Sequence, residues 1–255
     1  MTRWERFYCP FLPKEGEVWV GGSEAHHMLH VLRLKPGQKV YLFDGRGTEA
    51  TGRILEALKD RARLEIEESA QISREARVAI TLAFSIPKGQ RAEVLVEKVC
   101  ELGVRRLVPI ECQRSVVKLK QEGSQKLEKW RKRAIEAAKQ CGRAYVTEVE
   151  GMTSFPVLLE ETSRHELALL ASTDPGVRPL QEVIGEHPAV GARCNVPLLC
   201  IVGPEGGFTE EEVERAKGAG CLEVGMGPRI LRTETASIAL VSILHFAYGF
   251  GSPCN

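Results

Sequence analysis

Short runs of alternating apolar and polar positions fill the first seventy residues, and glycine, proline or aspartate separates the runs. Alternation with a period of two is typical of strands that bury one face. Residues 44–47, Asp-Gly-Arg-Gly, form a turn signal after one run. Residues 23–33 look helical instead, with Ser23 as a possible N-cap. The pattern predicts a small β-barrel from strands at 17–20, 38–43, 48–58 and 61–68.

The pattern changes after a polar stretch at residues 71–77. From there, apolar runs of strand length alternate with segments whose apolar positions have helical spacing. Strands that alternate with helices are typical of an α/β domain with a parallel sheet. We therefore expect two domains, 1–72 and 73–255. The second should contain strands at 78–86, 107–112, 166–171, 196–202 and 221–225, and helices at 88–102, 124–141 and 233–248.

Composition indicates an ordinary globular protein, with 43% hydrophobic and 27% charged residues in a chain of 255. No apolar run approaches the roughly 18–20 residues that span a bilayer, and no secretory signal is visible, so we expect a cytoplasmic protein. The eight cysteines include no C-x-x-C pair, and we expect reduced thiols and no metal site. Three neighbouring histidines, His26, His27 and His30, lack partners at ligand spacing and are expected to be surface or packing residues.

Charge is distributed unevenly along the chain. Residues 114–143 contain ten Lys or Arg and three Glu, a balance of 10 − 3 = +7, whereas residues 144–255 contain seven basic and fifteen acidic residues, a balance of 7 − 15 = −8. A basic stretch of this kind fits a phosphate backbone. It fits a solvated helix face equally well, and composition does not decide between the two.

Two segments near the C-terminus have the same layout of strand, glycine-proline loop and helix start. The first, residues 201–212, is Ile-Val-Gly-Pro-Glu-Gly-Gly-Phe-Thr-Glu-Glu-Glu, in which Thr209 and Glu212 form a capping box. The second, residues 226–236, is Met-Gly-Pro-Arg-Ile-Leu-Arg-Thr-Glu-Thr-Ala. One such loop is more often a tight turn than a ligand cradle. The pair favours a nucleotide-like ligand outside the carboxyl end of a parallel sheet.

The pair resembles the SPOUT class of S-adenosylmethionine-dependent RNA methyltransferases, and within it the RsmE family, which methylates N3 of a uridine in 16S ribosomal RNA of the small subunit. The resemblance extends over nearly the whole chain, through the motifs Arg6-Phe7, 30–37, 43–45, Lys88-Gly89, 97–103 and 137–143. It implies a PUA-like β-barrel that helps hold RNA, followed by a SPOUT α/β domain with a trefoil knot. It also implies a homodimer, which the apolar segment 238–246 supports.

In proteins similar to this one, three loops at strand ends hold S-adenosylmethionine, mainly through backbone groups. The expected cofactor residues are Leu170, Ala171 and Ser172; Val202, Gly203, Pro204, Glu205, Gly206 and Gly207; and Met226, Gly227, Ile230, Leu231 and Arg232. The glycine-rich signature of Rossmann-type methyltransferases is missing after the strand at 78–86.

N3 of uracil is a weakly acidic imide that must lose its proton as the methyl group arrives. Arg232 could stabilise the developing oxyanion on the base, and Glu205 or Glu234 could accept the proton. Glu205 could equally be a structural carboxylate in its loop. Glu234 fits better as an acid in the first turn of a helix. Arg232 is therefore the leading catalytic candidate, and Glu205 the second.

Basic residues in both halves are candidates for RNA contacts. They are Arg6, Arg33, Lys35 and Arg46 in the expected barrel, Lys88 and Arg91 at the entrance to the second domain, Lys129, Arg131, Arg133 and Arg143 in the basic stretch, and Arg229 in the last glycine loop. Three rival functions remain open at this point. They are a non-catalytic RNA-binding module, an enzyme for a different small nucleotide, and a SPOUT enzyme that modifies another RNA nucleotide.

Overall fold

The computed structural model describes residues 5–118 and 124–249, and the chain divides into two compact units. The first unit contains Met1–Arg74 and the distant segment Ala138–Val146, and the second contains Glu75–Ala137 and Thr147–Asn255. No pattern in the sequence predicted that residues 138–146 would join the first unit.

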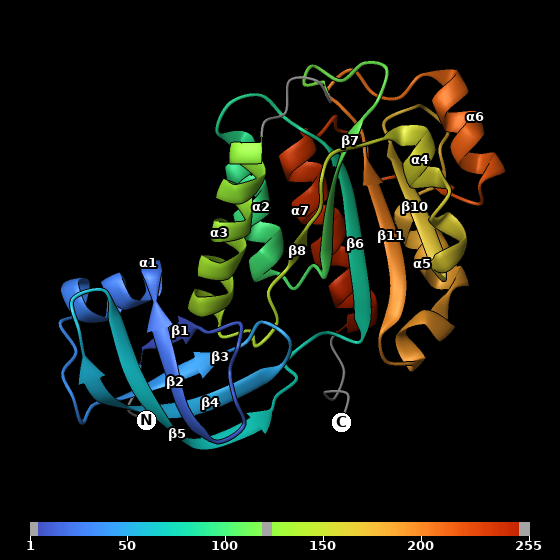
Figure 1. Cartoon of the computed structure of the whole chain (residues 1–255). Helices are drawn as coiled ribbons and strands as arrows, with labels where there is room; N and C mark the ends of the chain where they lie inside the picture. Colours follow the sequence, from blue (N-terminus) through green and yellow to red (C-terminus); the bar gives the residue numbers. More distant parts are fainter. Residues whose placement is uncertain (1–4, 119–123, 250–255) are drawn as a thin grey trace. The chain divides into compact units, whose positions relative to one another are not determined.

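The first unit is a curled five-stranded sheet with a short helical segment (Figure 1). Its elements are β1 (Arg6–Tyr8), β2 (Gly16–Gly21), α1 (Gly22–His26), a π-helical turn (His27–Val31), β3 (Lys39–Phe43), β4 (Thr48–Ala57) and β5 (Arg61–Gln71). The strand order is β1-β3-β4-β5-β2, in which β1 runs parallel to β3 and the other pairs are antiparallel. The four predicted strands are confirmed, and β1, only three residues long, was not predicted.

An apolar core and a group of ion pairs hold this unit together. Phe7, Met28 and Leu42 are fully buried in the core. Glu49 is 9% exposed, and its Oε1 forms ion pairs with Arg6 Nη1 at 2.8 Å and with Arg74 Nη1 at 2.7 Å. The same two guanidinium groups donate to backbone carbonyls of the 138–146 segment, at Arg143 and Gly142. Burial raises the pKa of Glu49, but the two arginines outweigh it and hold that pKa below its usual value.

The second unit is built on a parallel sheet (Figure 1). Its strands are β6 (Val78–Ser85), β7 (Arg106–Glu111), β8 (Glu148–Val149), β9 (Thr153–Ser154), β10 (Leu167–Ser172), β11 (Val196–Val202) and β12 (Leu222–Gly225). Its α-helices are α2 (Arg91–Glu101), α3 (Ser124–Cys141, shared with the first unit), α4 (Phe155–Leu159), α5 (Leu180–Glu186), α6 (Glu210–Gly218) and α7 (Thr233–Leu244). Short 3-10 turns (Thr162–Arg164, Pro188–Ala192) and a final π-helical turn (His245–Gly249) complete it.

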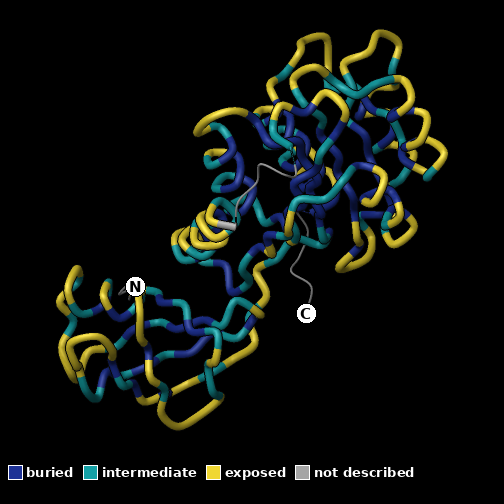
Figure 2. Tube along the Cα trace, turned by 45° about the horizontal axis from the view of Figure 1, so that its top comes forward, coloured by how far each residue is buried: buried dark blue, intermediate teal, exposed yellow. Residues whose placement is uncertain are grey.

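Strand order in this sheet is β12-β10-β11-β6-β7-β8, with β9 also beside β7, and every pair is parallel. Helix α7 packs against β6 and β11, and α2 packs against α7. On the opposite face, α4 and α6 share a buried cluster that includes Phe155, Val213 and Leu199. Helices therefore cover both faces and the central strands are buried (Figure 2). Burial on both faces explains why these strands are mostly apolar rather than alternating.

These observations confirm the predicted α/β fold with a parallel sheet. Helix α2 begins at Arg91 rather than at residue 88, and α7 ends at Leu244 before the π-helical turn. The capping box at the start of α6 is present as expected. Six cysteines in the described part are free thiols, but Cys194 is disulfide-bonded, so the expectation of reduced thiols is wrong there. The trefoil knot stays a prediction.

A candidate cofactor site at three strand ends

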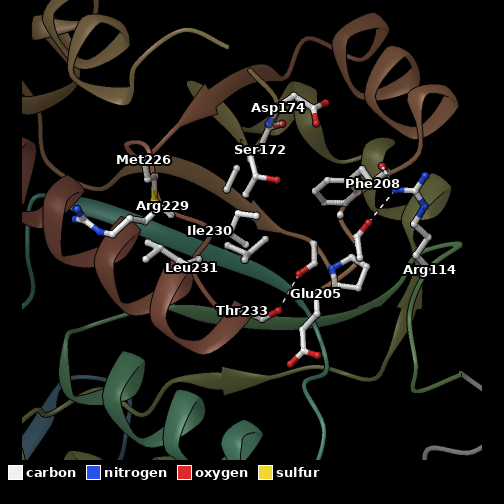
Figure 3. A pocket seen from close by; sticks show the side chains of 18 of the residues that line it. Arg114, Ser172, Asp174, Glu205, Phe208, Met226, Arg229, Ile230, Leu231 and Thr233 are labelled. Atoms are coloured by element: carbon white, nitrogen blue, oxygen red, sulfur yellow. Dashed lines mark hydrogen bonds between the residues drawn. The ribbon is translucent and has the colours of Figure 1, made fainter. Parts of the chain in front are cut away.

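The carboxyl ends of β10, β11 and β12 meet because β10 lies between the other two strands and all three are parallel. The loops that leave these ends enclose a cavity of about 300 Å³ (Figure 3). The side chains of α7 that line it are Thr233 and Ala236. Open parallel sheets bind ligands at this position, outside the carboxyl ends of their strands.

Most predicted cofactor residues line this cavity. From the expected set, the lining includes Ala171, Ser172, Val202, Gly203, Pro204, Glu205, Gly206, Gly207, Met226, Gly227, Ile230 and Leu231. Two expected residues do not. Leu170 is fully buried in the core between sheet and helices, and Arg232 is the exposed N-cap of α7. Eight further residues line it. Sequence reasoning assigned one of them, Arg229, to RNA binding and missed the other seven: Arg114, Thr173, Asp174, Phe208, Val213, Thr233 and Ala236.

The loop after β11 folds back on itself. The Gly207 amide donates to the Pro204 carbonyl at 2.8 Å, and Gly207 has a φ of +69°, which favours glycine. At Gly203 the reason for glycine is different, because an added Cβ would lie 2.7 Å from the Phe208 ring. That ring is held in turn against Phe155, with 5.2 Å between centroids. Gly203 therefore allows the Phe208 ring to pack against the backbone.

Gly206 differs from both neighbours. Its φ is not in the left-handed region, and an added Cβ would meet only the Arg114 side chain, at an ordinary 3.5 Å. Nothing in the fold requires a residue without a side chain at this position. Because Gly206 lines the cavity, a glycine here allows a ligand to approach its backbone closely.

The loop after β12 carries the other wall. Gly227 has a φ of +105°, and Ile230 is 80% exposed although it lines the cavity. The two walls are joined where the Thr233 hydroxyl donates to the Gly203 carbonyl at 3.0 Å. On the β10 side, the Asp174 amide donates to Ser172 Oγ at 3.2 Å. Backbone groups and aliphatic side chains thus dominate the lining, as they do in many nucleoside sites.

The acids proposed for catalysis are both close to Arg91 of α2. Glu205 forms an ion pair with Arg91, and its carboxylate points away from the other labelled side chains (Figure 3). Glu234 lies deeper, with its side chain 13% exposed and its Oε1 3.9 Å from the same guanidinium. Its Oε2 is buried and has no hydrogen-bond partner among the described residues. The Arg91 pairing supports a structural role for Glu205.

The candidate RNA-binding residues differ in burial and in ion pairing. Arg6 and Arg143 are almost completely buried within the first unit, so we no longer count them as phosphate ligands. In α3, Lys129 and Arg133 pair with the carboxylates of Glu93 and Glu97 in α2. Arg131 pairs with Glu128, one turn away. Lys129 and Arg131 are nevertheless exposed, as are Arg33, Lys35, Arg46, Lys88 and Arg229.

The described part of the chain, residues 5–118 and 124–249, contains no group of three or more His, Cys, Asp or Glu side chains placed to hold a metal ion. Within the same ranges, no helix has the length and apolar character to cross a membrane.

Comparison with known proteins agrees with this architecture. The family described as an RNA methyltransferase domain matches residues 74–245, and an RNA methyltransferase PUA domain matches residues 20–67. Ribosomal RNA small subunit methyltransferase E of Bacillus subtilis is 32% identical over 232 residues, which are 89% of each chain.

Two solved structures are also similar. The ribosomal RNA small subunit methyltransferase E of Neisseria gonorrhoeae, bound to S-adenosyl methionine, has a TM-score of 0.85 and 32% identity, covering 98% of this chain and 100% of that one. A putative methyltransferase of Legionella pneumophila in complex with the same cofactor has a TM-score of 0.86 and 31% identity, covering 97% and 99%. This chain therefore belongs to the RNA methyltransferase family that includes ribosomal RNA small subunit methyltransferase E.

Proposed function

We propose that this protein transfers a methyl group from S-adenosylmethionine to N3 of a uridine in the 16S RNA of the small ribosomal subunit, in the cytoplasm. The observation that carries the proposal is the cavity at the ends of β10, β11 and β12, with Gly206 in its lining. Family membership and the cofactor-bound relatives support the same assignment.

The residues of the cavity fit this cofactor. Sites for adenine commonly read its edge through backbone groups, and glycine and aliphatic residues such as Val202, Gly203 and Met226 line this cavity. The volume of about 300 Å³ lies at the lower end of the range for small-molecule sites, and Ile230 leaves one side open to solvent. When bound, S-adenosylmethionine supplies an activated methyl group on its sulfonium.

The chain's own residues have to position the uracil and stabilise its charge as N3 loses a proton. Arg232 follows the cavity residues Ile230 and Leu231 directly and is exposed at the N-terminus of α7. Its guanidinium can offer two donors to a uracil carbonyl, which stabilises charge that exists mainly in the transition state. Glu205 remains the second catalytic candidate, and as a base it would have to leave Arg91.

A second copy of this chain is the proposed occupant of an apolar surface on α2, α7 and the turn after it. Val94 is 50% exposed, Ile243 39% and Phe246 80%, which is unusual for side chains of this size in one part of a domain. Light scattering should give the mass of a dimer, and Phe246→Asp should shift the protein toward monomer. A monomer for the unaltered chain would rule out this part of the proposal.

The function is tested by mass mapping of methylated nucleotides in ribosomal RNA from cells with and without the protein. We expect one N3-methyluridine to disappear from the small-subunit RNA. Loss of a methyl group at another position would indicate a related enzyme with a different target, and no change at any nucleotide would indicate a binding module without activity.

A further inference from the structure

Arg114, on the loop after β7, reaches the cofactor cavity from a strand that does not contribute to the three strand ends. In the sheet, β6 separates β7 from β11. The Arg114 side chain nevertheless lines the cavity beside the loop that follows β11 (Figure 3). No sequence motif pointed to this residue, and the proposed chemistry does not use it.

The backbone around Arg114 is fixed on both sides. The amide of Gln113 donates to Glu212 Oε1 of α6 at 2.7 Å. Ser115 is 6% exposed; its hydroxyl accepts the Cys112 amide at 2.9 Å and contacts the hydroxyl of Ser85 at 2.8 Å. Because buried and capping interactions hold the residues before and after it, the direction in which Arg114 leaves the backbone is determined by the fold.

The side chain holds two carbonyl groups of the loop after β11. Arg114 Nη1 donates to the Gly206 carbonyl at 2.8 Å and to the Phe208 carbonyl at 3.2 Å. These carbonyls lie between a strand and a helix, where regular secondary structure does not pair them. Hydrogen bonds from a charged donor are stronger than those between neutral groups, so this contact limits the conformations of the loop. Gly206 and Phe208 both line the cavity in this same short segment.

Two other roles for Arg114 are less well supported. No carboxylate pairs with its guanidinium in the described part of the chain, so it is not one half of a structural ion pair. An RNA phosphate ligand would need a guanidinium free to turn outward, whereas this one is already bonded to two carbonyls of the cavity wall.

We propose that Arg114 is a positioning residue, which holds the Gly206–Phe208 backbone in the conformation that binds the adenosine part of S-adenosylmethionine. This inference rests on the proposed function and adds to it a residue outside the three loops. Positioning through backbone should affect every ligand that has the adenosine group, whether or not the ligand has an amino-acid part.

Calorimetry with two ligands tests the inference. S-adenosylmethionine and 5′-methylthioadenosine would be titrated into the unaltered protein and into Arg114→Met, which keeps an unbranched, flexible side chain close to the length of the arginine stem but has no donor. We expect Arg114→Met to weaken both ligands by about tenfold or more, and by similar factors. Arg114→Lys should recover part of the loss, because one nitrogen makes both bonds and lysine keeps a charged donor. Arg215→Ala removes an exposed arginine from α6 and should change neither affinity.

The possible outcomes separate the inference from the function. Unchanged binding in Arg114→Met would overturn the inference alone, and a loss confined to S-adenosylmethionine would overturn it in favour of direct contact with the amino-acid part. If the unaltered protein bound neither ligand, the proposed function would fail and the inference with it. Urea unfolding identifies any variant that does not fold. If Arg114→Met does not fold, the affinities of Arg114→Lys for the two ligands are compared with those of the unaltered protein instead.

Discussion

Replacing Gly206 with alanine should separate ligand binding from folding, because the fold itself leaves room for the new methyl group. The φ of Gly206 is outside the left-handed region, and the added Cβ would meet the Arg114 side chain at an ordinary 3.5 Å. Loss of glycine flexibility in the unfolded chain stabilises by at most about 1 kcal/mol. We therefore expect the free energy of unfolding to stay within about 1 kcal/mol of the unaltered value.

Two neighbouring glycines provide contrasting variants. In Gly203→Ala, the Cβ would lie 2.7 Å from a Phe208 ring that is packed against Phe155, so overpacking should cost about 1–3 kcal/mol of stability. In Gly227→Ala, the added side chain meets no atom within 4 Å, but the φ of +105° makes it strained, again by about 1–3 kcal/mol. For a domain of this size, each kcal/mol lowers the Tm by about 2–4 °C.

Affinity for S-adenosylmethionine, unlike stability, should fall in Gly206→Ala. A ligand lying against the Gly206 backbone has no space for a methyl group, so Gly206→Ala should weaken binding by about tenfold or more, which is about 1.4 kcal/mol. Calorimetric titration and urea unfolding of the same three variants give both quantities. Wild-type affinity in a stable Gly206→Ala protein would show that the ligand does not approach this backbone, and the assignment of the cavity would be refuted.

Three further predictions concern catalysis, RNA and pH. Arg232→Ala should lower single-turnover methylation about a hundredfold while cofactor affinity stays the same, and Arg232→Lys should recover only part; near-normal turnover would move suspicion to Glu205. Removing the exposed charges Arg33, Lys35 and Arg46 together should weaken RNA binding and flatten its dependence on salt, and an unchanged slope would exclude this surface. Burial lowers the pKa of His165, so the unfolded state binds its proton more readily and stability should fall as pH drops below about 6.5; urea unfolding of His165→Gln should show a smaller fall, and an equal one would contradict the assignment.

Elements whose signal is local were predictable from sequence. The capping box of α6 and the strand that precedes Gly203 depend on residues close together in the chain, and both are present. The convergence of three glycine-containing loops followed from the parallel sheet and from the family resemblance. The boundaries of α2 and α7 were less accurate, because helix ends depend on a few hydrogen bonds that periodicity does not report.

Several of the errors involve residues that are distant in sequence. Arg114 meets Gly206 across 92 positions, and Lys129 meets Glu93 across 36. From sequence, the basic stretch in α3 carried a large positive balance, but the acids that pair with Lys129 and Arg133 belong to another helix. Arg6 was expected on the surface, and its position beside the buried Glu49 depends on the strand pairing of the first unit. Pair contacts of this kind have no signature in a single sequence.

The first unit is interrupted in the chain, and this affects the order in which the protein can form during synthesis. Its residues up to Arg74 leave the ribosome early, but Ala138–Val146 emerges only after more than sixty residues of the second unit. Until then, the guanidinium groups of Arg6 and Arg74 lack the carbonyl partners that complete their hydrogen bonding. Domains usually form one after another from the N-terminus. Here the first unit can be completed only after residues 138–146 have been synthesised, and these follow the first part of the second unit in the chain.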